Sequence, residues 1–360
     1  PASASPDVGF DRAAPVAPAK AADVDGQRRE RSSERHVRVF FGTDRARVAG
    51  SAPGIEQFGG ERSTLQFGSA NVSIPPGHRL GEVERPKWYR LEFSPSPRKH
   101  VMLTQAGRLD QRAFVAAMND MIRKDAKPSS FVFVHGYNVK FEDALLRTAQ
   151  MAVDTGLLSV PILYSWPSQG NVAAYTVDEA NAEWARQDLL RFLDVLATES
   201  TAAEIVVIAH SMGSRPATWA LETLLRDRPE LGARFRGLVL AAPDLDAEVF
   251  VRDIMPALSP LHDRMTLYAS SKDRALAASF KVHGSVRAGS TAGGVVLAPG
   301  LETIDASVID TDFLGHSYLV SDRNLLTDLG LLLGRELRAD KRIYLEERAG
   351  AGRRYWAFKP

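Results

Sequence analysis

The chain has 360 residues, of which 44% are apolar and 25% charged, the composition of an ordinary globular protein. Lys and Arg number 45 and Asp and Glu 44, and no basic stripe carries interleaved aromatic residues, which argues against nucleic acid as an obligate partner. The absence of cysteine excludes a disulfide framework, a cysteine nucleophile, thiolate zinc sites and iron–sulfur clusters.

The first 35 residues are rich in Ala, Pro, Ser and charged residues and lack apolar periodicity, so residues 1–35 are predicted to be a disordered lead. A cleaved export signal followed by a tether would leave such a start, and trimming of a longer chain would leave it too. Both origins stay open, with export to the periplasm or the exterior slightly favoured. No apolar run approaches the roughly 18 residues of a membrane span, so no transmembrane segment is predicted.

Order is expected from residue 36, where the chain becomes rich in β-branched and aromatic residues separated by turn signals. The strand candidates of this part are residues 37–41, 70–74, 88–93 and 101–103. Residues 36–128 are therefore predicted to be a β-rich, antiparallel N-terminal part.

The rhythm changes after residue 110, because buried apolar runs begin to alternate with amphipathic stretches. The expected strands are residues 131–134, 160–164, 205–208, 237–240, 265–268 and one ending near 309, and the expected helices are 114–122, 141–153, 184–196, 213–226 and 325–337. This alternation predicts a mostly parallel central sheet flanked by helices on both faces. One domain is expected over residues 36–345, with the catalytic βα units in 129–345 and a C-terminal tail at 346–360.

The strongest chemical signal is Ala209-His210-Ser211-Met212-Gly213, between a β-branched strand and a helix. It is close to the G-x-S-x-G nucleophile elbow, with Ala209 in place of the first glycine. Such a turn lifts the serine hydroxyl above the sheet, so Ser211 is the predicted nucleophile and the backbone N–H of Met212 a predicted oxyanion donor. The alternative, that Ser211 is only a helix N-cap, would not require small residues on both sides.

A second turn, His135-Gly136-Tyr137-Asn138, directly follows a predicted strand. In hydrolases an H-G turn at this place supplies the second oxyanion N–H, here assigned to Tyr137. The alternative is a plain strand-to-helix turn with Asn138 as a cap.

A serine nucleophile needs a base, and the chain has eight histidines. His316 follows the last predicted strand and has Gly315 beside it, as the chain order Ser, Asp, His requires, so it is the predicted base. His283, at the start of a Gly-rich loop, is a rival. His210 adjoins the nucleophile, but its side chain is expected to diverge from Ser211 and to line a pocket.

The acid that orients the histidine is predicted to be Asp273, which follows the strand at 265–268. Its alternative role is an N-cap of a short helix. Asp246, after the preceding strand, is the alternative acid. Trp166 ends a strand on the same face and is a candidate pocket-lining residue, although packing is an equal possibility. No phosphate loop, dinucleotide fingerprint or H-E-x-x-H pair is present, so neither a cofactor nor a metal is expected.

Seven short motifs in fixed order carry a family resemblance. They are Phe41-Gly42-Thr43-Asp44-Arg45, Val72-Ser73-Ile74-Pro75, Val134-His135-Gly136-Tyr137-Asn138, Ser165-Trp166-Pro167-Ser168, Ala209-His210-Ser211-Met212-Gly213, Ala242-Pro243-Asp244-Leu245-Asp246 and Gly315-His316-Ser317. From about residue 37 to residue 356, the chain resembles a bacterial α/β-hydrolase family of otherwise unassigned function. The resemblance implies an esterase-like or lipase-like α/β-hydrolase fold and a serine triad, but no natural substrate.

The sequence thus predicts a serine hydrolase that cleaves carboxylic esters through a Ser211–His316–Asp273 triad and an acyl-enzyme intermediate. Its partner would be a small-molecule or lipid-like ester; the oligomeric state is not set by the sequence. Two alternatives stay open. One is an amidase or peptidase that uses the same triad, and the other is a non-catalytic binding module with a hydrolase-like fold.

Overall fold

The structure, a computed structural model, describes residues 34–50, 52–86, 92, 94–124, 128–156, 159–309 and 322–360. Residues 34–360 group into one compact unit. The predicted lead as far as residue 33, and all but one residue of the strand candidate at 88–93, lie outside the described residues. None of the described helices is long and apolar enough to cross a membrane.

The described strands form one 11-stranded sheet in the order β10-β11-β9-β8-β7-β6-β4-β5-β1-β2-β3. Their bounds are β1 Arg35–Arg47, β2 Phe58–Ile74, β3 Met102–Leu109, β4 Ser129–Val134, β5 Val160–Ser165, β6 Glu204–His210, β7 Phe235–Ala241, β8 Met265–Ala269, β9 Leu301–Asp305, β10 Leu345–Gly350 and β11 Arg353–Phe358. Neighbours from β11 to β1 pair in parallel, whereas β1–β2, β2–β3 and β10–β11 pair antiparallel. The sheet is therefore mostly parallel, as the alternation of apolar runs predicted.

Helical segments connect the strands. The longer helices are α2 Gln111–Ile122, α3 Phe141–Asp154, α4 Tyr175–Trp184, α5 Arg186–Glu199, α6 Ser214–Asp227, α9 Arg274–His283 and α11 Arg323–Gly334. The short ones are η2 Val172–Ala174, η3 Ser211–Gly213, η4 Pro229–Arg234, α7 Ala247–Val249, the π-helical η5 Phe250–Ile254, α8 Met255–Ala257, η6 Ser259–Leu261 and η7 Ala339–Lys341.

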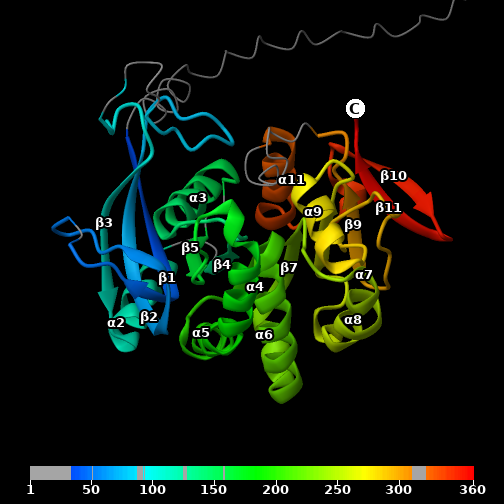
Figure 1. Ribbon diagram of the computed structural model, residues 1–360, viewed down its shortest axis with the longest axis horizontal. Coiled ribbons are helices and arrows are strands. Elements are labelled where there is room, and N and C mark those ends of the chain that lie inside the picture. The colour runs from blue at the N-terminus through cyan, green and yellow to red at the C-terminus, as the bar shows by residue number, and fades with distance from the viewer. Residues whose placement is uncertain are drawn as a thin grey trace, which may run out of the picture. The chain divides into compact units, whose positions relative to one another are not determined.

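Both faces of the sheet are buried, and each has its own apolar cluster. Along β6, Ile205, Val207 and Ala209 face one cluster, and Val206 and Ile208 face the other. The first cluster contains residues of α2, α5 and α6, and the second contains residues of α3 and α11, which Figure 1 shows on opposite sides of the sheet. A strand buried on both faces reads as a continuous apolar run, which is why these strands were readable from the sequence.

The C-terminal part differs from expectation. Residues 346–360, expected to be a tail outside the domain, form the β10–β11 hairpin, and β11 joins the sheet where Trp356 pairs with Ile304 of β9. The hairpin turns at Ala351 and Gly352, whose φ angles are 46° and 72°. A two-residue turn with both φ angles positive matches the twist of the strands it joins.

At the N-terminal side, the antiparallel arrangement of β1, β2 and β3 agrees with the β-rich part predicted there. These strands are not a separate layer, because β1 also pairs in parallel with β5, with Gly42 opposite Tyr164. The pairing brings Thr43 to Arg45 of β1 to the carboxyl ends of β4 and β5, where ligands bind in open α/β sheets.

Candidate functional site

Ser211 lies directly after β6, at the carboxyl edge of the sheet, and is 2% exposed. Its φ is +53°, a left-handed conformation that strains a residue with a β-carbon by about 1 kcal/mol or more. The N-cap positions before η3 and α6 belong to His210 and Gly213, so the alternative in which Ser211 is a helix N-cap is wrong. A strained serine between a buried strand and a helix is the geometry of a nucleophile elbow.

Two glycines let the turn after β4 pack against Ser211. A β-carbon at Gly213 would lie 2.2 Å from the carbonyl oxygen of His135, and one at Gly136 would lie 3.0 Å from the β-carbon of Ser211. The backbone N–H of Asp244 donates to the carbonyl oxygen of Ser211 at 3.2 Å. The structure thus brings together the two turns that the sequence assigned to the nucleophile and to the oxyanion donor.

The turn after β4 is held in place by the packing and hydrogen bonding of Trp166. The imidazole of His135 stacks on Trp166, with ring centroids 5.1 Å apart, and the Trp166 indole Nε1 donates to the carbonyl oxygen of His135 at 2.7 Å. Trp166 is fully buried, so it packs beneath the turn and does not line an open pocket as proposed from the sequence. Asn138 has φ +58° and donates its N–H to Asp178, and the residue capping α3 is Lys140, so Asn138 is a turn residue and no cap.

Asp273, the predicted acid, follows β8 at the same edge and is 2% exposed. One of its oxygens accepts from the N–H groups of Ala275 and Leu276, at 3.0 Å each, so the N-cap role foreseen for it is present. Burial first, and then the charge of Asp273, raises the pKa of the Tyr137 hydroxyl.

The alternative acid, Asp246, occupies a different environment. Its side chain accepts from the N–H groups of Glu248 and Val249 at 3.0 Å and is the N-cap of α7. The bond from Val249, followed by a bond from the Ser285 hydroxyl, lowers the pKa of Asp246. A partly exposed capping carboxylate is explained by the helix alone.

The predicted base, His316, falls in residues 310–321 and lies outside the described residues. Its rival His283 has both ring nitrogens engaged elsewhere. Nε2 lies 2.7 Å from Glu179, and Nδ1 lies 2.9 Å from the carbonyl oxygen of Ser279. These contacts belong to a network that ties α4 to α9, so His283 has a structural role there.

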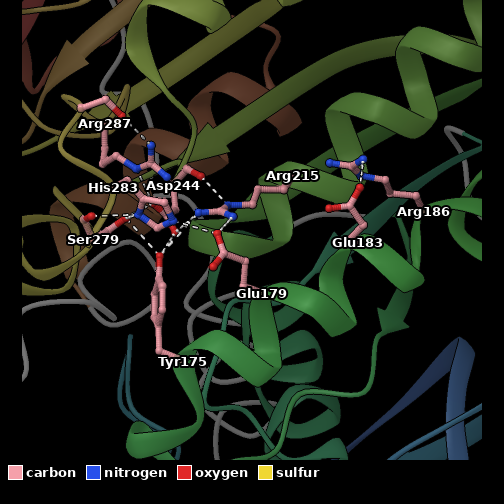
Figure 2. A network of polar contacts seen from close by, with 10 residues as sticks. Tyr175, Glu179, Glu183, Arg186, Arg215, Asp244, Ser279, His283 and Arg287 are labelled. Carbon is pink, nitrogen blue, oxygen red and sulfur yellow. Dashed lines mark hydrogen bonds and ion pairs between the residues drawn. The ribbon is translucent and has the colours of Figure 1, made fainter. Parts of the chain in front are cut away.

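That network centres on Asp244, which the sequence reasoning missed (Figure 2). Asp244 is 2% exposed and accepts from its neighbours Arg287 at 2.8 Å, Ser279 and Tyr175 at 2.6 Å, and Arg215 at 3.1 Å. Burial would raise the pKa of Asp244, but the charges of Arg215 and Arg287 outweigh it and lower the pKa to about 2. The carboxylate of Asp244, ionised at neutral pH, thus joins α4, α6, α9 and the loop after β7 beside Ser211.

His210 and Gly136 line a pocket of about 310 Å³ on the α3 side of the elbow. The other residues around it are Val83, Arg85, Phe133, His135, Val139, Asp143, Ala144 and Arg147. The pocket-lining role proposed for His210 agrees with this position. A second pocket of about 350 Å³ lies on the α6 side, between Arg215, Trp219 and Val249. Within the described parts of the chain, no three His, Cys, Asp or Glu residues gather as a metal site.

Comparison with known proteins identifies the family of the chain. The chain is 28% identical over 132 residues to the uncharacterized protein alr1448 of Nostoc sp., a match that covers 30% of this chain and 34% of that protein. The chain therefore matches about a third of the length of this relative. The family model described as "Alpha/beta hydrolase of unknown function (DUF900)" matches residues 110–335, which is more than half of the 360. The resemblance predicted from the motifs is confirmed, and the chain belongs to this family of α/β hydrolases.

Proposed function

We propose that this α/β hydrolase is a serine hydrolase that cleaves carboxylic esters. The observation that carries the proposal is the strained Ser211, held at φ +53° against Gly136 of the neighbouring turn. A strained conformation persists only where the surrounding structure enforces it, and such residues cluster at active sites. Here the strain serves to lift the serine hydroxyl above the carboxyl edge of the sheet.

In the proposed mechanism, His316 accepts the proton of Ser211 as the hydroxyl oxygen attacks the ester carbonyl carbon. The backbone N–H groups of Met212 and Tyr137 stabilise the negative charge that develops on the carbonyl oxygen. His316 then protonates the leaving alcohol, and water attacks the acyl-enzyme by the same route. Asp273 orients His316 and stabilises its charged form.

The chain that follows β7 favours an open site over that of a lid-gated lipase. Between Asp246 and β8 it forms only the short helical segments α7, η5, α8 and η6, without a long insertion that would serve as a lid. An open site suits small or surface-presented esters. The same triad can hydrolyse amides, because its histidine can protonate a leaving amine, so matched ester and amide substrates decide between the two classes.

The first test is labelling of the purified protein with a fluorophosphonate probe, followed by peptide mapping by mass spectrometry. Wild-type protein should be labelled at Ser211, and the variant Ser211→Ala should lose both labelling and hydrolysis of p-nitrophenyl butyrate. Ser214, buried in the first turn of α6, provides the matched control, because Ser214→Ala should remain labelled. Folded wild-type protein that is neither labelled nor active would refute the proposal and favour a binding module.

A further inference from the structure

Arg45, at the end of β1, is a charged side chain buried in the floor of the site, with 1% of its surface exposed. Its guanidinium donates Nε to Ser165 Oγ at 2.8 Å and Nη2 to the carbonyl oxygen of Val139 at 2.8 Å. Nη1 donates to two further carbonyl oxygens, those of Gly59 and Ser168, at 2.9 and 2.8 Å. Burying a charge is costly unless it is hydrogen-bonded, and these bonds tie β2, the end of β5 and the segment after it to the turn after β4, which indicates a positioning task.

The remaining side-chain contact of Arg45 concerns which ring nitrogen of His135 carries the proton. Nη2 of Arg45 lies 3.3 Å from Nε2 of His135. A guanidinium only donates, so Nε2 must be the acceptor and the ring proton must sit on Nδ1. Nδ1 lies 2.7 Å from the carbonyl oxygen of Gly136, to which it therefore donates. Burial first, and then the charge of Arg45, lowers the pKa of His135 well below its usual value, so the ring stays neutral at neutral pH.

The bond to Gly136 sets the direction of the next N–H group. The peptide between Gly136 and Tyr137 is planar and trans, so its C=O and N–H point in opposite directions. With the carbonyl oxygen held toward the His135 ring, the N–H of Tyr137 points to the other side of the turn. The Gly136 backbone is also packed against Ser211, where a β-carbon would leave only 3.0 Å.

We propose that Arg45 is a positioning residue that acts through His135 to aim the Tyr137 N–H at the oxyanion formed on Ser211. The inference rests on the proposed function and adds to it a residue of β1 that lies far along the chain from Ser211 and from the turn after β4. Arg45 does not touch the substrate. It fixes which nitrogen of His135 carries the proton, and the proton fixes the peptide that carries the oxyanion donor.

Asp178 binds the backbone N–H groups of the same turn, directly and through Ser168. Its carboxylate accepts from the N–H of Asn138 at 2.9 Å and from Ser168 Oγ at 2.6 Å, and Ser168 Oγ accepts from the N–H of Val139 at 3.0 Å. Carbonyl groups of this region are thus held by Arg45 and amide groups by Asp178. An oxyanion donor held on both sides is already oriented before the reaction, which is the condition under which such a donor is most effective.

The test compares wild type with Arg45→Lys and the milder Ser165→Ala, which removes the hydroxyl 2.8 Å from Arg45 Nε and 3.1 Å from His135 Nε2. Lysine keeps the charge, but one ammonium group cannot reach Ser165, Val139 and His135 together. For p-nitrophenyl butyrate, kcat should fall about 10- to 100-fold in Arg45→Lys and less in Ser165→Ala, with KM little changed. Binding of phenylboronic acid, which forms a tetrahedral adduct on an activated serine, should weaken in parallel with kcat/KM.

Two further measurements separate positioning from stability. Arg342, a second buried arginine, lies in an ion-pair cluster with Asp328, and Arg342→Lys should destabilise the fold without weakening boronate binding. The ¹⁵N resonances of His135 should show a protonated Nδ1 in wild type and a mixture of tautomers in Arg45→Lys, whether or not the protein is active.

The outcomes are distinct. Wild-type protein that fails to label at Ser211 refutes the proposed function, and the inference falls with it. If wild type is active, the inference alone is refuted when folded Arg45→Lys and Ser165→Ala keep wild-type kcat and boronate affinity. It is refuted equally when the proton of His135 sits on Nε2 in wild type.

Discussion

The β-carbon that Gly213 lacks would lie 2.2 Å from the carbonyl oxygen of His135. The short helix η3, which begins at Ser211, and the turn after β4 therefore touch through backbone atoms. No side-chain rotation could relieve a clash at this contact. This contact joins the carboxyl ends of β4 and β6, and through them the proposed nucleophile and the proposed oxyanion donor.

Gly213→Ala should therefore be strongly destabilising, by about 3 kcal/mol, because backbone must move to admit one methyl group. The free energy of unfolding from urea titration measures this effect. Gly107→Ala is the matched control, since no atom lies within 4 Å of a β-carbon there, and its effect should stay below about 1 kcal/mol. Equal effects at the two glycines would contradict the close contact.

The acid is identified by a second pair of variants, Asp273→Asn and Asp246→Asn. Asparagine caps a helix as well as aspartate does, so both variants keep their N-cap bonds and lose only a charge. Asp273→Asn should lower kcat by about 10³- to 10⁴-fold, as expected when a triad histidine loses its carboxylate. Asp246→Asn should stay within about twofold of wild type. The reverse ranking in ester hydrolysis would move the acid to the loop after β7.

The features that could be predicted from the sequence are those that leave a local pattern in it. Apolar periodicity located the central strands, and the small residues of the elbow located Ser211, because both are local properties. The β10–β11 hairpin was missed, because its residues do not alternate between apolar and polar and only the turn at Ala351 and Gly352 marks it. A helix predicted from Trp184 onward proved to be two, α4 and α5, with Trp184 at the end of α4 and 49% exposed.

The direction in which a side chain points was the second property that the sequence did not reveal. The motif after β7 contains two aspartates, and the sequence reasoning gave Asp246 as the alternative acid although Asp244 is the buried one. Ala242 takes a φ of 46° directly after the strand, and such a turn breaks the in–out alternation on which a sequence argument relies. The role of Arg45 was equally invisible, since its partners lie between 14 and 123 residues away along the chain.

His78 predicts a loss of stability at alkaline pH. Its Nδ1 and Nε2 each lie 2.9 Å from a carboxylate, Glu84 and Asp154 respectively, which clamps the loop after β2 onto α3. Burial lowers the pKa of His78, but the bonds to Asp154 and Glu84 outweigh it and raise the pKa to about 9. Because the folded pKa is above the unfolded value of about 6.5, the stabilisation is full below pH 6.5 and is lost as the pH rises through 9.

His78→Gln should therefore cost about 2 kcal/mol at pH 6, less than the whole pKa shift implies because solvent screens part of the interaction. At pH 10 the variant and wild type should differ little. Urea titrations at the two pH values measure the difference, and a cost that does not change with pH would show that His78 is uncharged in the clamp.

Asp44 predicts the opposite kind of effect. Its carboxyl group is fully buried, with Asp188 near it, and burial raises its pKa to about 7. Because the unfolded carboxyl ionises near pH 3.8, stability falls as the pH rises from about 4 to 7 and stays low above. Asp44→Asn should thus stabilise the protein by about 2 kcal/mol at pH 8 and have little effect at pH 4. The exposed Asp227 serves as control, and a gain in Asp227→Asn of similar size would point to net charge instead.

The pocket beside the elbow predicts the acyl-chain preference of the proposed esterase. Its volume of about 310 Å³ is enough for a short to medium chain. Val83 lines it from the loop after β2, away from the turns that hold Ser211 and Tyr137. Val83→Trp should fill the space and lower kcat/KM for p-nitrophenyl octanoate more than about 10-fold while the acetate stays within about twofold.

Val249→Trp, in the pocket on the α6 side, is the matched control. If Val249→Trp shifts the preference instead, the acyl chain lies on the α6 side; if both esters fall together, the pocket does not hold the chain.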